Sequence, residues 1–88
     1  MSKISFSESA WEEYLYWQIQ DKKTLKKINE LLKEIKRTPF TGKGEPEGLR
    51  GDLSGKWSRR INIKDRLVYE VSDEMITVLQ CKGHYDDK

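Results

Sequence analysis

Six residues in the second half of the chain carry the side chains that RNA cleavage requires. They are one carboxylic acid, three guanidinium groups, one imidazole and one phenol, on Glu47, Arg50, Arg60, Arg66, His84 and Tyr85. When RNA is cleaved by its own 2′-hydroxyl, a base removes the hydroxyl proton and an acid protonates the leaving 5′-oxygen. Cations stabilise the charge that gathers on the phosphate. The six residues match these needs if the fold brings them together.

The histidine and the arginines can also be explained without a function. His84 is the only histidine and lies near the end of the sequence, where a lone histidine is more often a plain surface residue. Two arginines on a sheet can instead form cross-strand pairs with acids such as Glu70 or Asp52. The choice between these readings depends on the elements that carry the residues.

The hydrophobic pattern predicts a strand, two helices and four further strands. Alternation indicates a strand at residues 3–6, and Ser7 is suited to cap a helix over residues 8–20. Asp21 is suited to cap a second helix, which ends near Lys36 and has an apolar stripe at Leu25, Ile28, Leu31, Leu32 and Ile35. The Gly- and Pro-rich residues 38–48 are expected to form a loop. The later strands are expected at residues 49–53, 56–63, 66–71 and 75–81.

This order predicts an α+β fold of βααββββ type, with both helices packed on one face of an antiparallel sheet. Strand alternation places one apolar face at Trp57, Ile61 and Ile63, and another at Leu67, Tyr69 and Val71. If both faces meet the helices, Arg60 and Arg66 lie together on the open face, joined by an odd-length turn near residues 63–65. There they could bind phosphate oxygens in a bidentate manner. Arg59 falls on the helix side and needs a partner or an edge position.

Length and composition exclude several classes of protein. A chain of 88 residues is expected to form one domain over residues 1–88. Its hydrophobic fraction of 35% and charged fraction of 36% are too polar for a membrane protein, and its aromatic content is too high for a disordered one. No membrane span or signal peptide is recognisable, so a cytoplasmic location is expected. Cys81 is the only cysteine, which excludes an internal disulfide and offers no metal-ligand pair, and no cofactor is expected.

The basic charge lies in the middle of the chain. The net charge is +2, but residues 21–37 sum to +4 and residues 38–66 sum to +3. This distribution suits a polyanionic partner such as RNA, and it equally suits a solvated helix face beside a sheet surface.

The sequence resembles the YoeB toxins, a branch of the RelE superfamily of ribosome-dependent mRNA interferases. The resemblance covers nearly the whole chain. The stretches that carry it are specific together and weak singly: residues 11–18, 26–31, 37–40, 42–44, 46–47, 53–55, 57–61, 66–69 and 84–85. It implies a RelE-like fold.

The resemblance also implies roles for the residues named above. Glu47 matches the general base, His84 the general acid, and Tyr85 an aromatic residue that stacks on or aligns a base. Arg60 and Arg66 match phosphate-binding arginines. Arg50 stands where the family usually has lysine, and Gly83 stands where it often has a bulky residue.

The resemblance further implies partners. Such toxins cleave mRNA in the 30S A site of the ribosome, are neutralised by a cognate antitoxin of the YefM type, and tend to form homodimers. The predicted first helix has more aromatic surface than a small core can bury, at Trp11, Tyr16 and Trp17, and a dimer or antitoxin contact could use the remainder. Two other readings stay open at this point: a protein-binding toxin like the ParE inhibitors of DNA gyrase, and a non-catalytic RNA-binding module.

Overall fold

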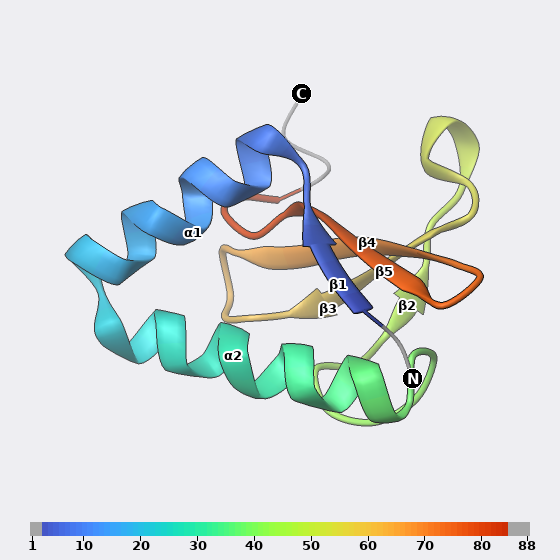
Figure 1. Cartoon of the computed structure of the whole chain (residues 1–88), viewed down its shortest axis with the longest axis horizontal. Coiled ribbons are helices and arrows are strands. Elements are labelled where there is room, and N and C mark those ends of the chain that lie inside the picture. The colour runs from blue at the N-terminus through green and yellow to red at the C-terminus, as the bar shows by residue number, and fades with distance from the viewer. Residues whose placement is uncertain (1–2, 85–88) are drawn as a thin grey trace.

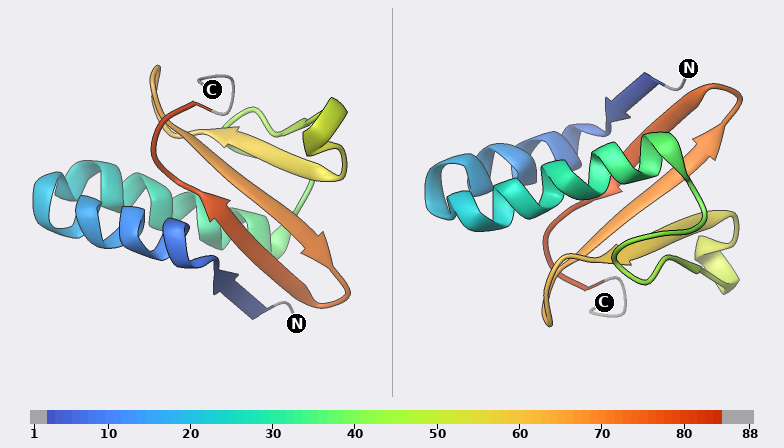
Figure 2. Two further views of the ribbon diagram at one scale, coloured as in Figure 1. Left: turned by 90° about the horizontal axis from the view of Figure 1, so that it is seen from above. Right: turned by 90° about the horizontal axis from the view of Figure 1, so that it is seen from below.

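The chain forms two helices and a five-stranded sheet. The computed structural model describes residues 3–84. Its elements, in chain order, are β1 (Lys3–Phe6), α1 (Glu8–Gln20), α2 (Lys22–Arg37), β2 (Glu47–Gly48), a 3-10 helix (Gly51–Leu53), β3 (Lys56–Arg60), β4 (Arg66–Ser72) and β5 (Met75–Gln80). Figures 1 and 2 show both helices on the same side of the sheet, whose strand order is β1-β5-β4-β3-β2. This is the predicted α+β class.

Two side-chain caps set the helix boundaries as predicted. The Ser7 hydroxyl accepts a hydrogen bond from the Ala10 amide at the start of α1. The Asp21 carboxylate accepts from the amides of Lys23 and Thr24 and from the Thr24 hydroxyl at the start of α2. These bonds, with that from the Thr24 hydroxyl the strongest, lower the pKa of Asp21 below its ordinary value.

The core lies between the helices and the sheet. From α2 it takes Ile28, Leu31, Leu32 and Ile35, so the predicted stripe is confirmed, with Leu25 at its margin. The contribution of α1 is smaller: it buries Ala10 and Trp17 and leaves Trp11, Leu15, Tyr16 and Ile19 exposed. The expected aromatic surplus on this helix is therefore found at Trp11 and Tyr16, while Trp17 belongs to the core.

Four details differ from the prediction. Glu47–Gly48, expected within the loop at residues 38–48, form the short strand β2. The sheet is mixed, because β1 pairs with β5 in parallel; no tight hairpin joins these strands, so nothing local fixes their relative direction. The strand expected at residues 49–53 is a 3-10 helix that starts at Gly51, whose φ is +65°. Ile63, expected to face the helices, is 83% exposed. The strand ends at Arg60, and the Asn62 side chain accepts from the amides of Lys64 and Asp65 to form a turn.

No helix within residues 3–84 is both long enough and apolar enough to cross a membrane.

Candidate active site

Arg60 and Arg66 lie directly opposite each other on β3 and β4, on the face that the helices leave open. This confirms the parity argument, with five residues in the odd-length connection between the paired arginines. Like charges opposite each other across two strands repel. Arg60 is half exposed, and its Nε lies 3.7 Å from a carboxylate oxygen of Glu45, which is too exposed to offset much of that repulsion. An anion bound between the two guanidiniums would relieve it.

The guanidinium of Arg66 is held by the turn that precedes it. Nη1 donates to the carbonyl oxygens of Asn62 at 2.7 Å, Ile63 at 3.2 Å and Asp65 at 3.2 Å. Within residues 3–84, Nε and Nη2 make no hydrogen bond. Those two nitrogens form one edge of the planar group, and such an edge can donate to two oxygens of a phosphate.

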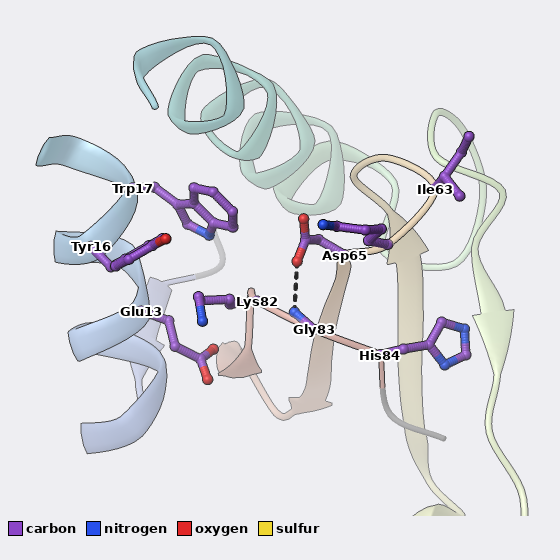
Figure 3. Close-up of a pocket in the computed structure, with 9 residues that line it drawn as sticks. Glu13, Tyr16, Trp17, Ile63, Asp65, Lys82, Gly83 and His84 are labelled. Atoms are coloured by element: carbon purple, nitrogen blue, oxygen red, sulfur yellow. Dashed lines mark hydrogen bonds between the residues drawn. The ribbon is translucent and has the colours of Figure 1, made fainter. Parts of the chain in front are cut away.

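The backbone of Gly83 fixes His84 next to Arg66. The Gly83 amide donates to Asp65 Oδ1 at 2.7 Å, and the Gly83 carbonyl accepts from the Arg66 amide at 2.9 Å and from Gln80 Nε2 at 3.0 Å. Gly83 has φ of +83°, which favours glycine at this position. His84 is half-buried, and Figure 3 shows its imidazole turned away from Tyr16 and Trp17 of α1. The lone histidine therefore has a fixed backbone beside an arginine.

Glu47 lies on the same open face. It pairs with Ser58 of β3, so Arg60, two residues further along β3, is its diagonal neighbour. Diagonal neighbours lie about 7–8 Å apart in an antiparallel pair, which is within reach of long side chains. Glu47 is exposed at the end of the loop that follows α2.

Arg59 is the main residue whose role the sequence did not reveal. Its side chain is fully buried on the helix side of β3. Nε donates to the Tyr69 hydroxyl, Nη1 to the Lys43 carbonyl, and Nη2 to the carbonyls of Thr38 and Thr41. The guanidinium thus ties the loop that leads to Glu47 onto the sheet. The Tyr69 hydroxyl in turn donates to the Pro39 carbonyl.

The remaining predicted site residues are Arg50 and Tyr85. Arg50 is exposed where the 3-10 helix begins, and its side chain makes no hydrogen bond to any residue of the described chain. Tyr85 lies outside the described residues. Over residues 3–84, no group of three or more His, Cys, Asp or Glu side chains is placed to hold a metal ion.

Buried titratable groups lie in the core behind this face. Burial, more than the acids Glu13 and Asp65, raises the pKa of the Cys81 thiol to about 12. Burial also raises the pKa of Tyr69, against the opposing effect of Arg59. Neither group faces the arginine pair, since Cys81 contacts the Ala10 carbonyl and Tyr69 points to the helix side.

Known proteins resemble this chain in sequence and fold over almost its entire length. The family model for the YoeB-like toxin of bacterial type II toxin–antitoxin systems matches residues 6–85. The Toxin YoeB of Escherichia coli strain K12 is 54% identical over 83 residues, which are 94% of this chain and 99% of that relative. A chain of the heterotetrameric YoeB–YefM complex from Staphylococcus aureus is 51% identical, with a TM-score of 0.89 over 97% of this chain and 99% of that one. The YoeB dimer from Staphylococcus aureus gives 52% identity and a TM-score of 0.89 over 96% of this chain and 98% of that one. This chain therefore belongs to the YoeB-like toxins of bacterial type II toxin–antitoxin systems.

Proposed function

We propose that this toxin is a ribosome-dependent mRNA endoribonuclease, which cleaves mRNA in the A site and thereby inhibits translation in the cytoplasm. The observation that carries the proposal is the Arg60–Arg66 pair, because two opposed guanidiniums on an open sheet face suit a phosphodiester. The hydrogen bond from the Arg66 amide to the Gly83 carbonyl adds a histidine next to that pair. Family membership supports the same reading.

The two ionisable groups divide the acid–base work. Glu47, exposed to solvent at the end of its loop, removes the proton of the attacking 2′-hydroxyl. His84 protonates the leaving 5′-oxygen. Tyr85 then stacks on or aligns a base.

The arginines stabilise the charge that develops on the phosphate. The free Nε and Nη2 edge of Arg66 donates to its oxygens, and the Asn62, Ile63 and Asp65 carbonyls keep that edge in place. Arg60 contributes a second charge from the opposite strand. Arg50 adds a more distant positive charge for the RNA backbone.

The partners follow from the relatives. We propose that a YefM-like antitoxin neutralises this toxin and that the toxin forms a homodimer, since relatives of about half-identical sequence occur as a YoeB–YefM complex and as a YoeB dimer. The exposed apolar residues of α1, namely Trp11, Leu15 and Ile19, are available for such contacts. The basic α2 suits a contact with ribosomal RNA.

Primer extension on an mRNA translated with and without the protein tests the proposal. Glu47→Ala and His84→Ala are each expected to slow cleavage by about 10²–10⁴-fold, as is usual for the loss of a general acid or base. Arg66→Ala is expected to be at least as damaging. The matched controls are Glu30→Ala and Lys3→Ala, which remove one negative and one positive charge from exposed positions that the proposal does not use.

Full cleavage by a Glu47→Ala/His84→Ala double variant would contradict this mechanism. Binding to ribosomes with no cleavage product would favour the non-catalytic RNA-binding module. Inhibition of DNA gyrase without any effect on mRNA would favour the ParE-like reading.

A further inference from the structure

A cleft of about 670 Å³ opens beside the proposed active site, between the second half of α1, the β3–β4 turn and the segment after β5. This volume is within the range of about 300–1,000 Å³ found for small-ligand pockets. Figure 3 shows Tyr16 extending from α1 towards Lys82, with His84 at the opposite margin. The cleft therefore adjoins the residue that would protonate the leaving oxygen, and the imidazole of that residue points outward from the cleft margin.

The charges in the cleft are arranged to receive an anion. Its two carboxylates are already used by the backbone: Glu13 accepts from the Cys81 amide at 2.8 Å, and Asp65 accepts from the Gly83 amide at 2.7 Å. Its two ammonium groups, on Lys64 and Lys82, form no salt bridge with residues 3–84. An incoming phosphate would find these lysines available.

An aromatic surface lies next to one of these cations. Tyr16 is 44% exposed, and the Lys82 ammonium lies 4.8 Å from the centre of its ring. Trp17 contacts Tyr16 edge to face and donates to the Cys81 carbonyl, so the ring rests on the core. Proteins that bind single-stranded nucleic acid combine such rings, which contact bases, with cations that contact phosphates.

We propose that this cleft binds the first nucleotide on the 3′ side of the cleaved bond. The inference rests on the proposed function, because it takes its direction from His84: the oxygen that His84 protonates is the 5′-oxygen of that nucleotide. With the scissile phosphate on Arg60 and Arg66, the nucleotide beyond His84 enters the cleft. Its base lies against Tyr16, and its 3′-phosphate lies between Lys64 and Lys82.

Single-turnover cleavage on ribosomes tests the cleft in the working toxin. Four messages that differ only in the nucleotide 3′ of the cleaved bond are compared. Tyr16→Ala is expected to weaken cleavage at limiting toxin by roughly 10-fold and to change the order of preference among the four messages, since stacking on a ring depends on the base. Tyr16→Phe keeps the ring and is expected to retain both the wild-type level of cleavage and the wild-type order of preference. Phe40→Ala removes an exposed ring outside the cleft and is expected to leave the preference unchanged.

The lysines are tested in the same assay. Lys64→Ala/Lys82→Ala is expected to weaken cleavage roughly 10-fold and to make it less sensitive to salt, because two phosphate contacts are lost. An unchanged preference and rate in both the Tyr16→Ala and the lysine variants would overturn the proposal. So would normal cleavage with loss of neutralisation by the antitoxin, which would assign the cleft to a protein partner.

A binding experiment separates this inference from the proposed function. Adenosine 3′-monophosphate has the base, 5′-hydroxyl and 3′-phosphate of the leaving nucleotide, and can be titrated into isotope-labelled toxin without any cleavage step. We expect amide shifts at Tyr16, Lys64 and Lys82 that are absent with inorganic phosphate alone and in Tyr16→Ala. Shifts confined to other residues would overturn the cleft assignment, whereas failure of the wild-type toxin to cleave mRNA would overturn the function instead.

Discussion

Replacing Arg59 by methionine is expected to destabilise the toxin strongly although it removes no apolar contact surface. Methionine fills much of the same space but cannot donate the hydrogen bonds that Arg59 makes to the Tyr69 hydroxyl and to three loop carbonyls. A hydrogen bond from a charged donor contributes about 1.5–3 kcal/mol, and more is lost when its partner stays buried. Two of the three carbonyls belong to the exposed residues Thr41 and Lys43, where water can replace the guanidinium. The expected loss in free energy of unfolding is therefore about 3 kcal/mol.

Thermal unfolding followed by circular dichroism measures this loss. In a domain of this size, each kcal/mol lowers Tm by about 4–8 °C, so Arg59→Met is expected to lower it by about 12–24 °C. The matched control is Arg37→Met, since Arg37 is 72% exposed and makes one surface ion pair with Glu34. Its Tm is expected to change little. A fall of less than about 4 °C for Arg59→Met would refute the claim that this side chain holds the loop to the sheet.

Three further outcomes are expected. Folding lowers the pKa of the Asp21 carboxyl from its ordinary 3.8, so the carboxylate stabilises the fold above that value, and this stabilisation is lost as the pH falls through the lowered pKa. In urea unfolding, Asp21→Asn should therefore show a smaller loss of stability at low pH. With a pKa of about 12, the Cys81 thiol should resist a thiol reagent at about pH 8 in the folded toxin and react only on unfolding; rapid reaction in the native state would contradict the described burial. Gly44→Ala should destabilise by about 1–3 kcal/mol, because its Cβ would lie 2.9 Å from Leu31 Cδ2 at a φ of +87°. Gly55→Ala, with φ of +91° and no atom within 4 Å, should cost less in the same melts, and equal losses would mean that only backbone strain matters.

The sequence could predict what depends on local periodicity. The caps at Ser7 and Asp21 are chemical signals that lie next to the helices they start. Alternation together with an odd-length turn predicted that Arg60 and Arg66 share the open face, because two apolar strand faces that meet the same helices leave their other faces together. Their direct pairing comes from the register of the structure. Alternation therefore gave the arginine face, whereas the proposed roles of Glu47 and His84 came from the resemblance to the YoeB toxins.

What the sequence could not predict depends on distant contacts. The partners of Arg59 are carbonyls of a loop at residues 38–43, and backbone carbonyls carry no residue-specific signal. The segment at residues 49–53 begins and ends with leucine, which suggested a short strand, but only Leu49 is buried, and the chain turns at Gly51. The backbone position next to His84 depends on the hydrogen bond from the Gly83 amide to the buried Asp65, and the sequence around Asp65 suggests only a turn.

The position of β5 in the sheet has a consequence for how the toxin is made. Within residues 3–84 this strand is the last in sequence, yet it lies between β1 and β4, and it is the strand with which β1 pairs. During synthesis the N-terminal elements emerge first, so β1 remains without a strand partner until residues 75–80 have been added. His84 follows only after that strand. A nascent chain thus lacks both the strand that pairs with β1 and its proposed acid until residue 84 has been added, and before that point it is not expected to cleave mRNA.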